Sequence, residues 1–345
     1  MASVGLVSAS PGLRRRWLGC VLVVLTAGLG GCTGDAERPG PVPLSPTASG
    51  KAAEWRSLAP SRTERTEVAA AADGPRIYVA GGYARDGDTV TTVEVFDTRT
   101  GRWTDGPALP VAVNHAMAAD VAGAVHVVGG YLGDGNVSDA VFRLSSSGDS
   151  WQRVAAMPEG RAAGTAVAVD GKLYVAGGVG PNRELAQRML VYDPTADAWS
   201  TAPGPPTPRE HLGGAGVDGR VHTVGGRVAF PGTLGAFEAY DPRTGEWTSL
   251  PDLPTPRGGL AATAACSDFV VAIGGEAEDG TFAEAEVFNV RTGSWHALPG
   301  LPTPRHGLGV VAVGTVVHAL SGGPEPGLHV ANTTEAIDLA GAGQC

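Results

Sequence analysis

Arginine recurs in this chain at positions where its chemistry could bind a ligand. Five arginines stand ten residues after a tryptophan, and Val113 takes the sixth equivalent place: Arg65, Arg161, Arg209, Arg257 and Arg305. The planar guanidinium pairs well with carboxylate and phosphate groups, often through two hydrogen bonds at once. If these side chains converge on one surface, they form a cationic ring suited to an anionic ligand, such as an acidic sugar or an acidic protein loop.

The same arginines have a structural interpretation. A residue repeated in every unit of a repeat is usually there for packing, and the guanidinium donors could satisfy backbone carbonyls between units. The sequence leaves both interpretations open. Better site candidates are the neighbouring polar residues that break the repeat: Glu67, Asn114, His115, Glu210, His211 and His306. Among these we select His115, Glu210, His211 and His306 as ligand-binding candidates.

No short motif assigns a reaction to the chain. It has no nucleophile elbow, no phosphate-binding loop and no closely spaced group of cysteines and histidines. We therefore predict no metal ion and no other cofactor. If the chain is an enzyme, the general acid and base are His211 with Glu210, or His115 across from them. The formal net charge of −10 gives no basis for binding nucleic acid.

Short strands must position these residues, because the 345-residue chain has 52 glycines, 26 prolines and a strict internal period. Tryptophans stand 48 residues apart: Trp55, Trp103, Trp151, Trp199, Trp247 and Trp295. Glycine pairs recur in step, from Gly81–Gly82 to Gly322–Gly323. Within a unit, stretches such as RIYVAGG and TTVEVFD alternate in polarity, and turns such as DTRTG follow them. A period of roughly 40–50 residues built from such strands is typical of a β-propeller.

The units resemble the kelch repeat. An apolar strand ends in Gly-Gly, the next strand carries a glutamate in four units (Glu94, Glu238, Glu286 and Glu335), and a tryptophan follows. The resemblance covers residues 55–339 or so and implies an all-β, six-bladed kelch-type propeller, which we assign to residues 55–345. Trp55 precedes the first glycine pair and no tryptophan follows the last pair, so the N-terminal strand is expected to close the last blade.

One face of this propeller is the better place for a site. The loops that follow the Gly-Gly strands differ in length and sequence, whereas the turns at the other ends of the strands are short and alike. Varied loops around a channel mouth usually carry specificity. The connections that carry the arginines enter the channel from the same side. We call this side the top face and expect the ligand there.

A kelch fold is compatible with several functions. Our main hypothesis is a binding protein whose ligand is an anionic glycan or a protein partner and which acts as a monomer. The alternative is an enzyme acting on sugars, as in the exported bacterial sialic acid mutarotase, and a third hypothesis is an adaptor for other envelope proteins. Galactose oxidase is also built on kelch units, but its copper site needs a tyrosine cross-linked to a cysteine. No such pair falls at the top face here, so we do not expect copper-radical chemistry.

The N-terminal segment is typical of an export signal. RRRWLGCVLVVLTAGLGGC (14–32) combines three arginines, an apolar run too short to span a bilayer, and small residues. LGGC resembles the bacterial lipobox, which implies a signal peptide over residues 1–31, lipid on Cys32 and an extracytoplasmic position on the bacterial cell membrane. RRRWL also resembles a twin-arginine signal, so the export route stays open. Residues 32–54, rich in Pro, Ser and Gly, predict a flexible tether.

Two cysteines lie in the predicted propeller, Cys266 and Cys345. In an oxidising compartment they could form a disulfide that pins the C-terminal tail.

Overall fold

The computed structural model describes residues 42–43, 53–230, 232–340 and 345. The predicted signal peptide, Cys32 and most of the predicted tether lie outside the described residues. No helix within the described ranges is both long and apolar enough to cross a membrane.

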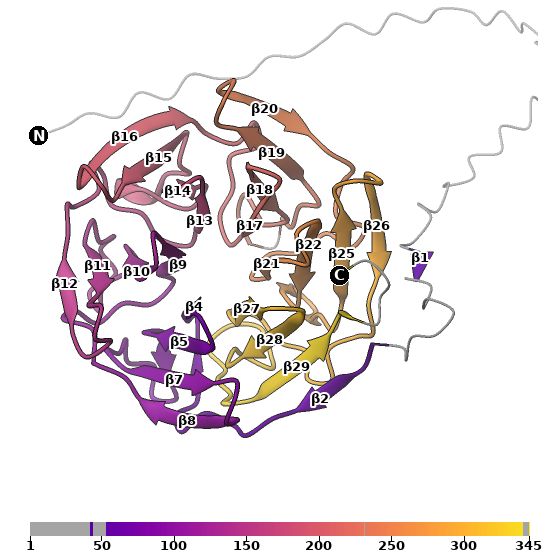
Figure 1. Ribbon diagram of the computed structural model, residues 1–345, viewed down its shortest axis with the longest axis horizontal. Helices are drawn as coiled ribbons and strands as arrows, with labels where there is room; N and C mark the ends of the chain where they lie inside the picture. Colours follow the sequence, from indigo (N-terminus) through magenta and orange to yellow (C-terminus); the bar gives the residue numbers. More distant parts are fainter. Residues whose placement is uncertain (1–41, 44–52, 231, 341–344) are drawn as a thin grey trace, which may run out of the picture. The chain divides into compact units, whose positions relative to one another are not determined.

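Six blades of four antiparallel strands surround a central channel, and the sheet of one blade has a fifth strand (Figure 1). From the channel outward, blade one contains β4 (Ala69–Asp73), β5 (Arg76–Ala80), β7 (Val93–Asp97) and β8 (Arg102–Asp105). Blade two contains β9 (Met117–Val121), β10 (Ala124–Val128), β11 (Val141–Leu144) and β12 (Trp151–Arg153). Blade three contains β13 (Thr165–Val169), β14 (Lys172–Ala176), β15 (Arg188–Asp193) and β16 (Ala198–Pro203). Blade four contains β17 (Gly213–Val217), β18 (Arg220–Val224), β19 (Phe237–Asp241) and β20 (Glu246–Ser249). Blade five contains β21 (Ala261–Ala265), β22 (Phe269–Ile273), β25 (Ala285–Asn289) and β26 (Ser294–Ala297). Blade six contains β27 (Gly309–Val313), β28 (Val316–Leu320), β29 (Thr334–Asp338) and β2 (Trp55–Ser57). The predicted all-β, six-bladed propeller is confirmed.

Shorter elements lie outside the four main strands of each blade. Two small two-stranded sheets lie on the connections: β3 (Arg65–Thr66) pairs with β6 (Tyr83–Ala84), and β23 (Glu276–Ala277) forms a hairpin with β24 (Gly280–Thr281). Strand β1 (Val42–Pro43) pairs in parallel with β26. One 3₁₀ turn covers Pro181–Arg183.

The ring closes through the N-terminal strand, as predicted. Strand β2 pairs with β29, placing Trp55 opposite Ile337. The tryptophans explain the 48-residue period, because five of them donate an Nε1–H hydrogen bond to a carbonyl 44 residues earlier, over 2.7–2.9 Å. Trp55 makes the equivalent bond to the carbonyl of Pro299, which joins the outer strand of blade six to the segment that follows blade five.

The glycine pairs turn the chain at the top of each second strand. Gly81 has φ 66°, and a Cβ there would lie 2.4 Å from the carbonyl oxygen of Val113 in the next blade, so only glycine fits. In blade six the turn is made by Ser321 (φ 57°) and Gly322 (φ 99°). The predicted pairing of Gly322 with Gly323 in this role is therefore wrong by one residue.

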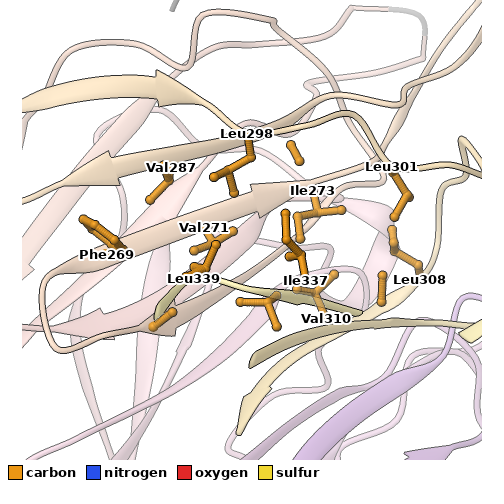
Figure 2. Packing of buried hydrophobic residues seen from close by; sticks show 14 residues of the cluster. Phe269, Val271, Ile273, Val287, Leu298, Leu301, Leu308, Val310, Ile337 and Leu339 are labelled. Atoms are coloured by element: carbon orange, nitrogen blue, oxygen red, sulfur yellow. The ribbon is translucent and has the colours of Figure 1, made fainter. Parts of the chain in front are cut away.

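Apolar side chains fill the spaces between neighbouring blades, and small ones line the channel. Figure 2 shows the cluster between blades five and six, where Val271 and Val287 face Leu308, Val310 and Ile337. Burying each such side chain stabilises the fold by about 1.5–3 kcal/mol. The innermost strands are rich in alanine and glycine, as in AAAAD of β4 and AATAA of β21, because six strands converge there.

Candidate functional site

The five repeated arginines lie inside the blades. Each of them is at most 1% exposed. Arg209 is representative: its Nη1 donates to Glu238 Oε2 over 2.5 Å, its Nε donates to the carbonyl of Gly225 over 2.6 Å, and its Nη2 donates to the carbonyl of Thr223 over 3.1 Å. These contacts support the structural interpretation of the arginines over a cationic ring at the mouth, because the guanidinium donors bind groups of their own blade.

The arginines and the repeated glutamates form buried pairs. Four blades have the pair: Arg65–Glu94, Arg209–Glu238, Arg257–Glu286 and Arg305–Glu335. Blade three lacks the strand glutamate, and there Arg161 pairs with Glu159. Blade two has neither charge, since Val113 and Phe142 occupy the two places and are 1% and 4% exposed. Both charges are absent together because a buried charge without its partner is strongly destabilising.

One residue from each blade forms the rim of the channel. These residues are spaced 48 apart and have φ between 50 and 64°: Glu67, His115, Ala163, His211, Gly259 and Gly307. Each later member donates its backbone N–H to the carbonyl of the one before it, and the N–H of Val68 donates to Gly307, all over 2.7–3.2 Å. This closed ring of hydrogen bonds holds the six residues around the channel. Three carry ionisable side chains, and the other three leave space between them.

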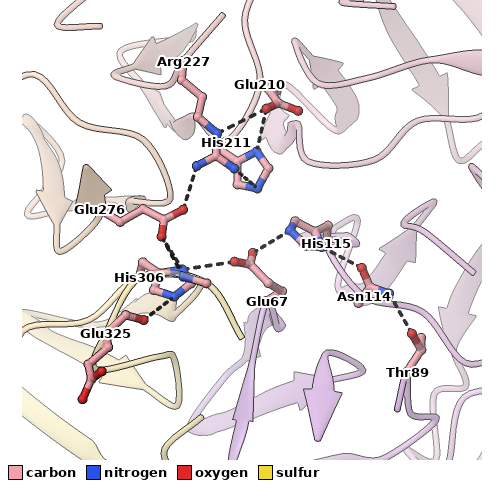
Figure 3. A network of polar contacts seen from close by, with 11 residues as sticks. Glu67, Thr89, Asn114, His115, Glu210, His211, Arg227, Glu276, His306 and Glu325 are labelled. Carbon is pink, nitrogen blue, oxygen red and sulfur yellow. Dashed lines mark hydrogen bonds and ion pairs between the residues drawn. The ribbon is translucent and has the colours of Figure 1, made fainter. Parts of the chain in front are cut away.

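The ionisable rim residues belong to a polar network, which we call the mouth cluster: Glu67, Asn114, His115, Glu210, His211, Arg227, Glu276 and His306 (Figure 3). The Glu67 carboxylate lies between two imidazoles, with Oε2 3.2 Å from His115 Nε2 and Oε1 3.2 Å from His306 Nδ1. His306 Nδ1 is also 3.6 Å from Glu276 Oε2. Through Glu67 and His306, the cluster thus connects residues of blades one, two, five and six.

Arg227 links the other side of the cluster. Its Nη1 donates to Glu276 Oε1 over 2.7 Å, its Nε donates to Glu210 Oε1 over 3.2 Å, and its Nη2 lies 3.0 Å from His211 Nε2. The four repeat-breaking candidates, His115, Glu210, His211 and His306, are therefore brought together. With three glutamates and one arginine, the mouth cluster has mixed charge.

Burial and neighbouring charges set the protonation states in the cluster. Burial lowers the pKa of His115 to about 4, although the charge of Glu67 acts in the opposite direction. Burial alone would raise the pKa of Glu67, but His115 and the hydrogen bond with His306 hold it well below its ordinary value. Burial also opposes the charged form of His306, yet its hydrogen bond with Glu67 raises the pKa of this imidazole. His115 is therefore neutral near pH 7, while the Glu67 carboxylate is charged.

The cluster opens into a cavity of about 140 Å³ in the upper channel. Rim residues form its upper wall, and small residues such as Ala70, Ala118 and Gly214 line it further down. Tyr83 and Tyr131 meet the His115 ring edge-on, with ring centroids 5.9 and 5.4 Å apart. The cavity therefore has ionisable groups at its rim and small residues below them, and the two tyrosines pack against the His115 ring.

Comparison with known proteins agrees with the repeat structure. The chain matches the model of the KLHDC2/KLHL20/DRC7 Kelch-repeats domain over residues 66–251 and 114–323. The chain belongs to the kelch-repeat family. It is similar to a solved structure titled "Structure of YjhT", with a TM-score of 0.70 and 17% identity, covering 80% of this chain and 95% of the other. At this identity the likeness shows the fold alone. No curated protein matches the chain.

The kelch frame shows why two members of the cluster were missed. Arg227 and Glu276 each follow a glycine pair directly, and Tyr83, Tyr131 and Val179 stand at the same place in other blades. This position faces the mouth, and its backbone bridges to the residue that precedes the rim residue, as Arg227 does to Glu210. The available signal was the change of residue type between blades at this one register position.

Cys266 and Cys345 form a disulfide, with their Cα atoms 4.7 Å apart. This is the pairing expected from the sequence. It lies outside the mouth cluster.

Proposed function

We propose that this kelch protein binds a small, hydroxyl-rich ligand of the sugar class at the mouth of its channel. The main support is that the fold does not need the polar rim residues. Ala163, Gly259 and Gly307 hold the same left-handed backbone as Glu67, His115 and His211 and complete the same hydrogen-bonded ring. Buried ionisable groups are costly, and groups beyond the needs of a fold are typical of functional sites.

The mixed charge of the cluster favours an uncharged sugar over an acidic one. The arginines that suggested an anionic glycan already bind the blades, and Arg227 is flanked by two glutamates. Carboxylates and neutral imidazoles accept hydrogen bonds from hydroxyl groups, and Arg227 donates them. Tyr83 and Tyr131 add aromatic surface beside them. Sites for small molecules commonly combine apolar walls with a few such polar groups.

A thermal-shift series tests this proposal. The full chain, purified in detergent, is heated with neutral hexoses, acidic sugars or no ligand. A sugar present at one hundred times its Kd should stabilise the fold by roughly 2.7 kcal/mol, which corresponds to a rise in Tm of roughly 5–10 °C. His211→Ala should abolish the shift, whereas His329→Ala, at an exposed loop residue, should keep it.

Two outcomes would contradict the proposal. Either no sugar shifts the wild-type protein, or His211→Ala responds as the wild type does. A shift with acidic sugars alone would restore the anionic class of ligand at the same site. If every sugar fails, a protein partner on the top loops becomes the better hypothesis, because Val228, Phe230 and Leu328 are about half exposed there.

A sugar-acting enzyme is the second candidate. The observation that favours it is the convergence of His115, His306 and Glu67, since ring opening of a sugar needs a proton donor and a proton acceptor in one site. NMR exchange spectroscopy on a bound sugar separates the two functions. An enzyme accelerates the interconversion of the two anomers, and a binding protein leaves that rate unchanged.

We also propose that the protein is exported and anchored by lipid on Cys32. The support is the lipobox-like LGGC together with the Cys266–Cys345 disulfide, because disulfides persist mainly in oxidising compartments. Cells fed a palmitate analogue should label the wild-type protein and not Cys32→Ala. An unlabelled wild-type protein would contradict the anchor.

A further inference from the structure

We propose that Glu67, His115 and His211 form a binding site for a divalent transition-metal ion, with Zn²⁺ as the best match. One ligand atom from each residue lies within 4.8 Å of the other two. Zinc bonds of about 2.1 Å place neighbouring ligand atoms about 3.4 Å apart, so the most distant pair of ligand atoms needs to come closer by up to about 1.4 Å. The residues come from equivalent rim positions of blades one, two and four.

The hydrogen bonds around His115 direct a lone pair at Glu67. Asn114 Nδ2 donates to Thr89 Oγ1 over 2.8 Å, and Asn114 Oδ1 lies 2.6 Å from His115 Nδ1. Because Oδ1 only accepts, Nδ1 carries the ring proton and Nε2 has a free lone pair. This lone pair lies 3.2 Å from Glu67 Oε2. Two electron-rich atoms at this distance repel each other unless a cation lies between them.

His211 also has its lone pair on Nε2. Arg227 Nη2 lies 3.0 Å from Nε2, and a guanidinium can only donate, so this nitrogen is unprotonated. The ring proton is then on Nδ1, which lies 3.4 Å from Glu210 Oε1. The two histidines therefore have the same tautomer, with the Nε2 lone pair as the metal-binding atom, which in His211 is paired with Arg227 in this structure.

Each proposed ligand has a polar partner behind it. Asn114 holds His115, His306 Nδ1 lies 3.2 Å from the second oxygen of Glu67, and Glu210 stands behind His211. Metal ligands in proteins are usually oriented by such outer partners. Three ligands with the cavity beside them leave one position open, which is the arrangement of catalytic zinc sites. Two imidazoles and one carboxylate favour a transition metal over Ca²⁺ or Mg²⁺.

Arg227 competes with the metal ion. Its Nη2 occupies the lone pair of His211, and its positive charge is close to the proposed ion. Glu210 and Glu276 hold the same guanidinium through Nε and Nη1, so Arg227 can lose its bond to His211 and remain paired. Removing Arg227 should therefore strengthen metal binding, whereas removing a ligand weakens it.

Metal titration tests the site in the absence of sugar, so its result is separate from the sugar-binding proposal. The full chain is purified in detergent without a histidine tag and stripped of metal with a chelator. Co²⁺ should produce the visible absorption of a four-coordinate site, and Zn²⁺ should displace it. Competition with a chromophoric chelator should give one Zn²⁺ per chain with a Kd below about 1 μM.

The variants should change the affinity for Zn²⁺ in opposite directions. Glu67→Gln and His211→Asn should weaken Zn²⁺ binding by at least about a hundredfold, and Asn114→Ala by about 10–100-fold. Arg227→Met should tighten it, a result that misfolding cannot produce. His329→Ala is the matched control and should bind as the wild type does. The proposal is overturned if the wild type binds no stoichiometric Zn²⁺, or if Glu67→Gln, shown to be folded by circular dichroism, binds Zn²⁺ as the wild type does.

Discussion

Removing Arg209 alone should destabilise the propeller more than removing Arg209 and Glu238 together. The Arg209 side chain is 0% exposed and that of Glu238 is 4% exposed, and the two are joined over 2.5 Å. Arg209→Val leaves a buried carboxylate whose remaining hydrogen bonds come from Thr207. The double variant Arg209→Val/Glu238→Phe copies blade two, where Val113 and Phe142 occupy these two places without charge.

The size of the effect follows from the loss of a buried partner. Breaking a buried ion pair by removing one member costs about 3–5 kcal/mol, which for a propeller of this size lowers Tm by roughly 6–15 °C. The free energy of unfolding of the double variant should fall by only about 1–2 kcal/mol, because no unpaired carboxylate remains. The remaining loss comes from the backbone carbonyls to which Arg209 had donated hydrogen bonds. Removing Glu238 alone leaves a buried guanidinium without its partner and should cost a similar amount, so the coupling energy between the two positions is about 4 kcal/mol or more.

Urea denaturation of the wild type, both single variants and the double variant measures this coupling. The reasoning is refuted if Arg209→Val costs less than about 1 kcal/mol, or if the double variant loses the sum of the two single losses. Either result would mean that the arginines do not hold the blades, and their role would have to be sought elsewhere.

Three further predictions concern the frame. Trp247→Phe should reduce the free energy of unfolding by about 1 kcal/mol in urea, because the 2.9 Å bond from Nε1 to the Pro203 carbonyl is lost; an unchanged midpoint would contradict this. Burial lowers the pKa of His222 to about 4, so the unfolded state binds more protons between pH 6.5 and 4. The His222 contribution should lower stability by up to about 3 kcal/mol as the pH drops through this window, and His222→Tyr, which has the residue type of Tyr78 and Tyr174, should remove that contribution, whereas His115 keeps its own. Cys266→Ser opens a 79-residue loop and should destabilise the fold by up to about 4 kcal/mol, and reductant should then have no additional effect on this variant.

The fold could be predicted because its repeat is visible in residue types. The tryptophans mark a hydrogen bond that recurs 44 residues back, and glycines such as Gly81 mark turns where a Cβ would meet the next blade. The turn in blade six was assigned one residue too late, to Gly322 and Gly323, because Ser321 adopts a left-handed backbone that sequence alone assigns to glycine. Spacing fixes the register of a residue, and the conformation it adopts also depends on its neighbours.

The site was predictable only in part. The choice of residues that break the repeat identified His115, Glu210, His211 and His306, because such residues are not required by packing. The role of the arginines could not be decided from spacing, since the same position can face the channel or the interior of a blade. The joint absence of arginine and glutamate in blade two was the one clue. The three proposed metal ligands are one or two repeats apart, so no short motif contains them.

The most direct test of the account is to block the mouth. Ala163 lies on the rim between His115 and His211 and shares their backbone conformation, so Ala163→Phe should fold and fill the space beside both imidazoles. Calorimetric titration with the sugar that gives the largest thermal shift compares this variant with the wild type. We expect at least about a hundredfold weaker binding with a wild-type-like Tm, since a filled cavity excludes the ligand. Unchanged affinity in a folded Ala163→Phe protein would place the ligand away from the mouth cluster and contradict the account.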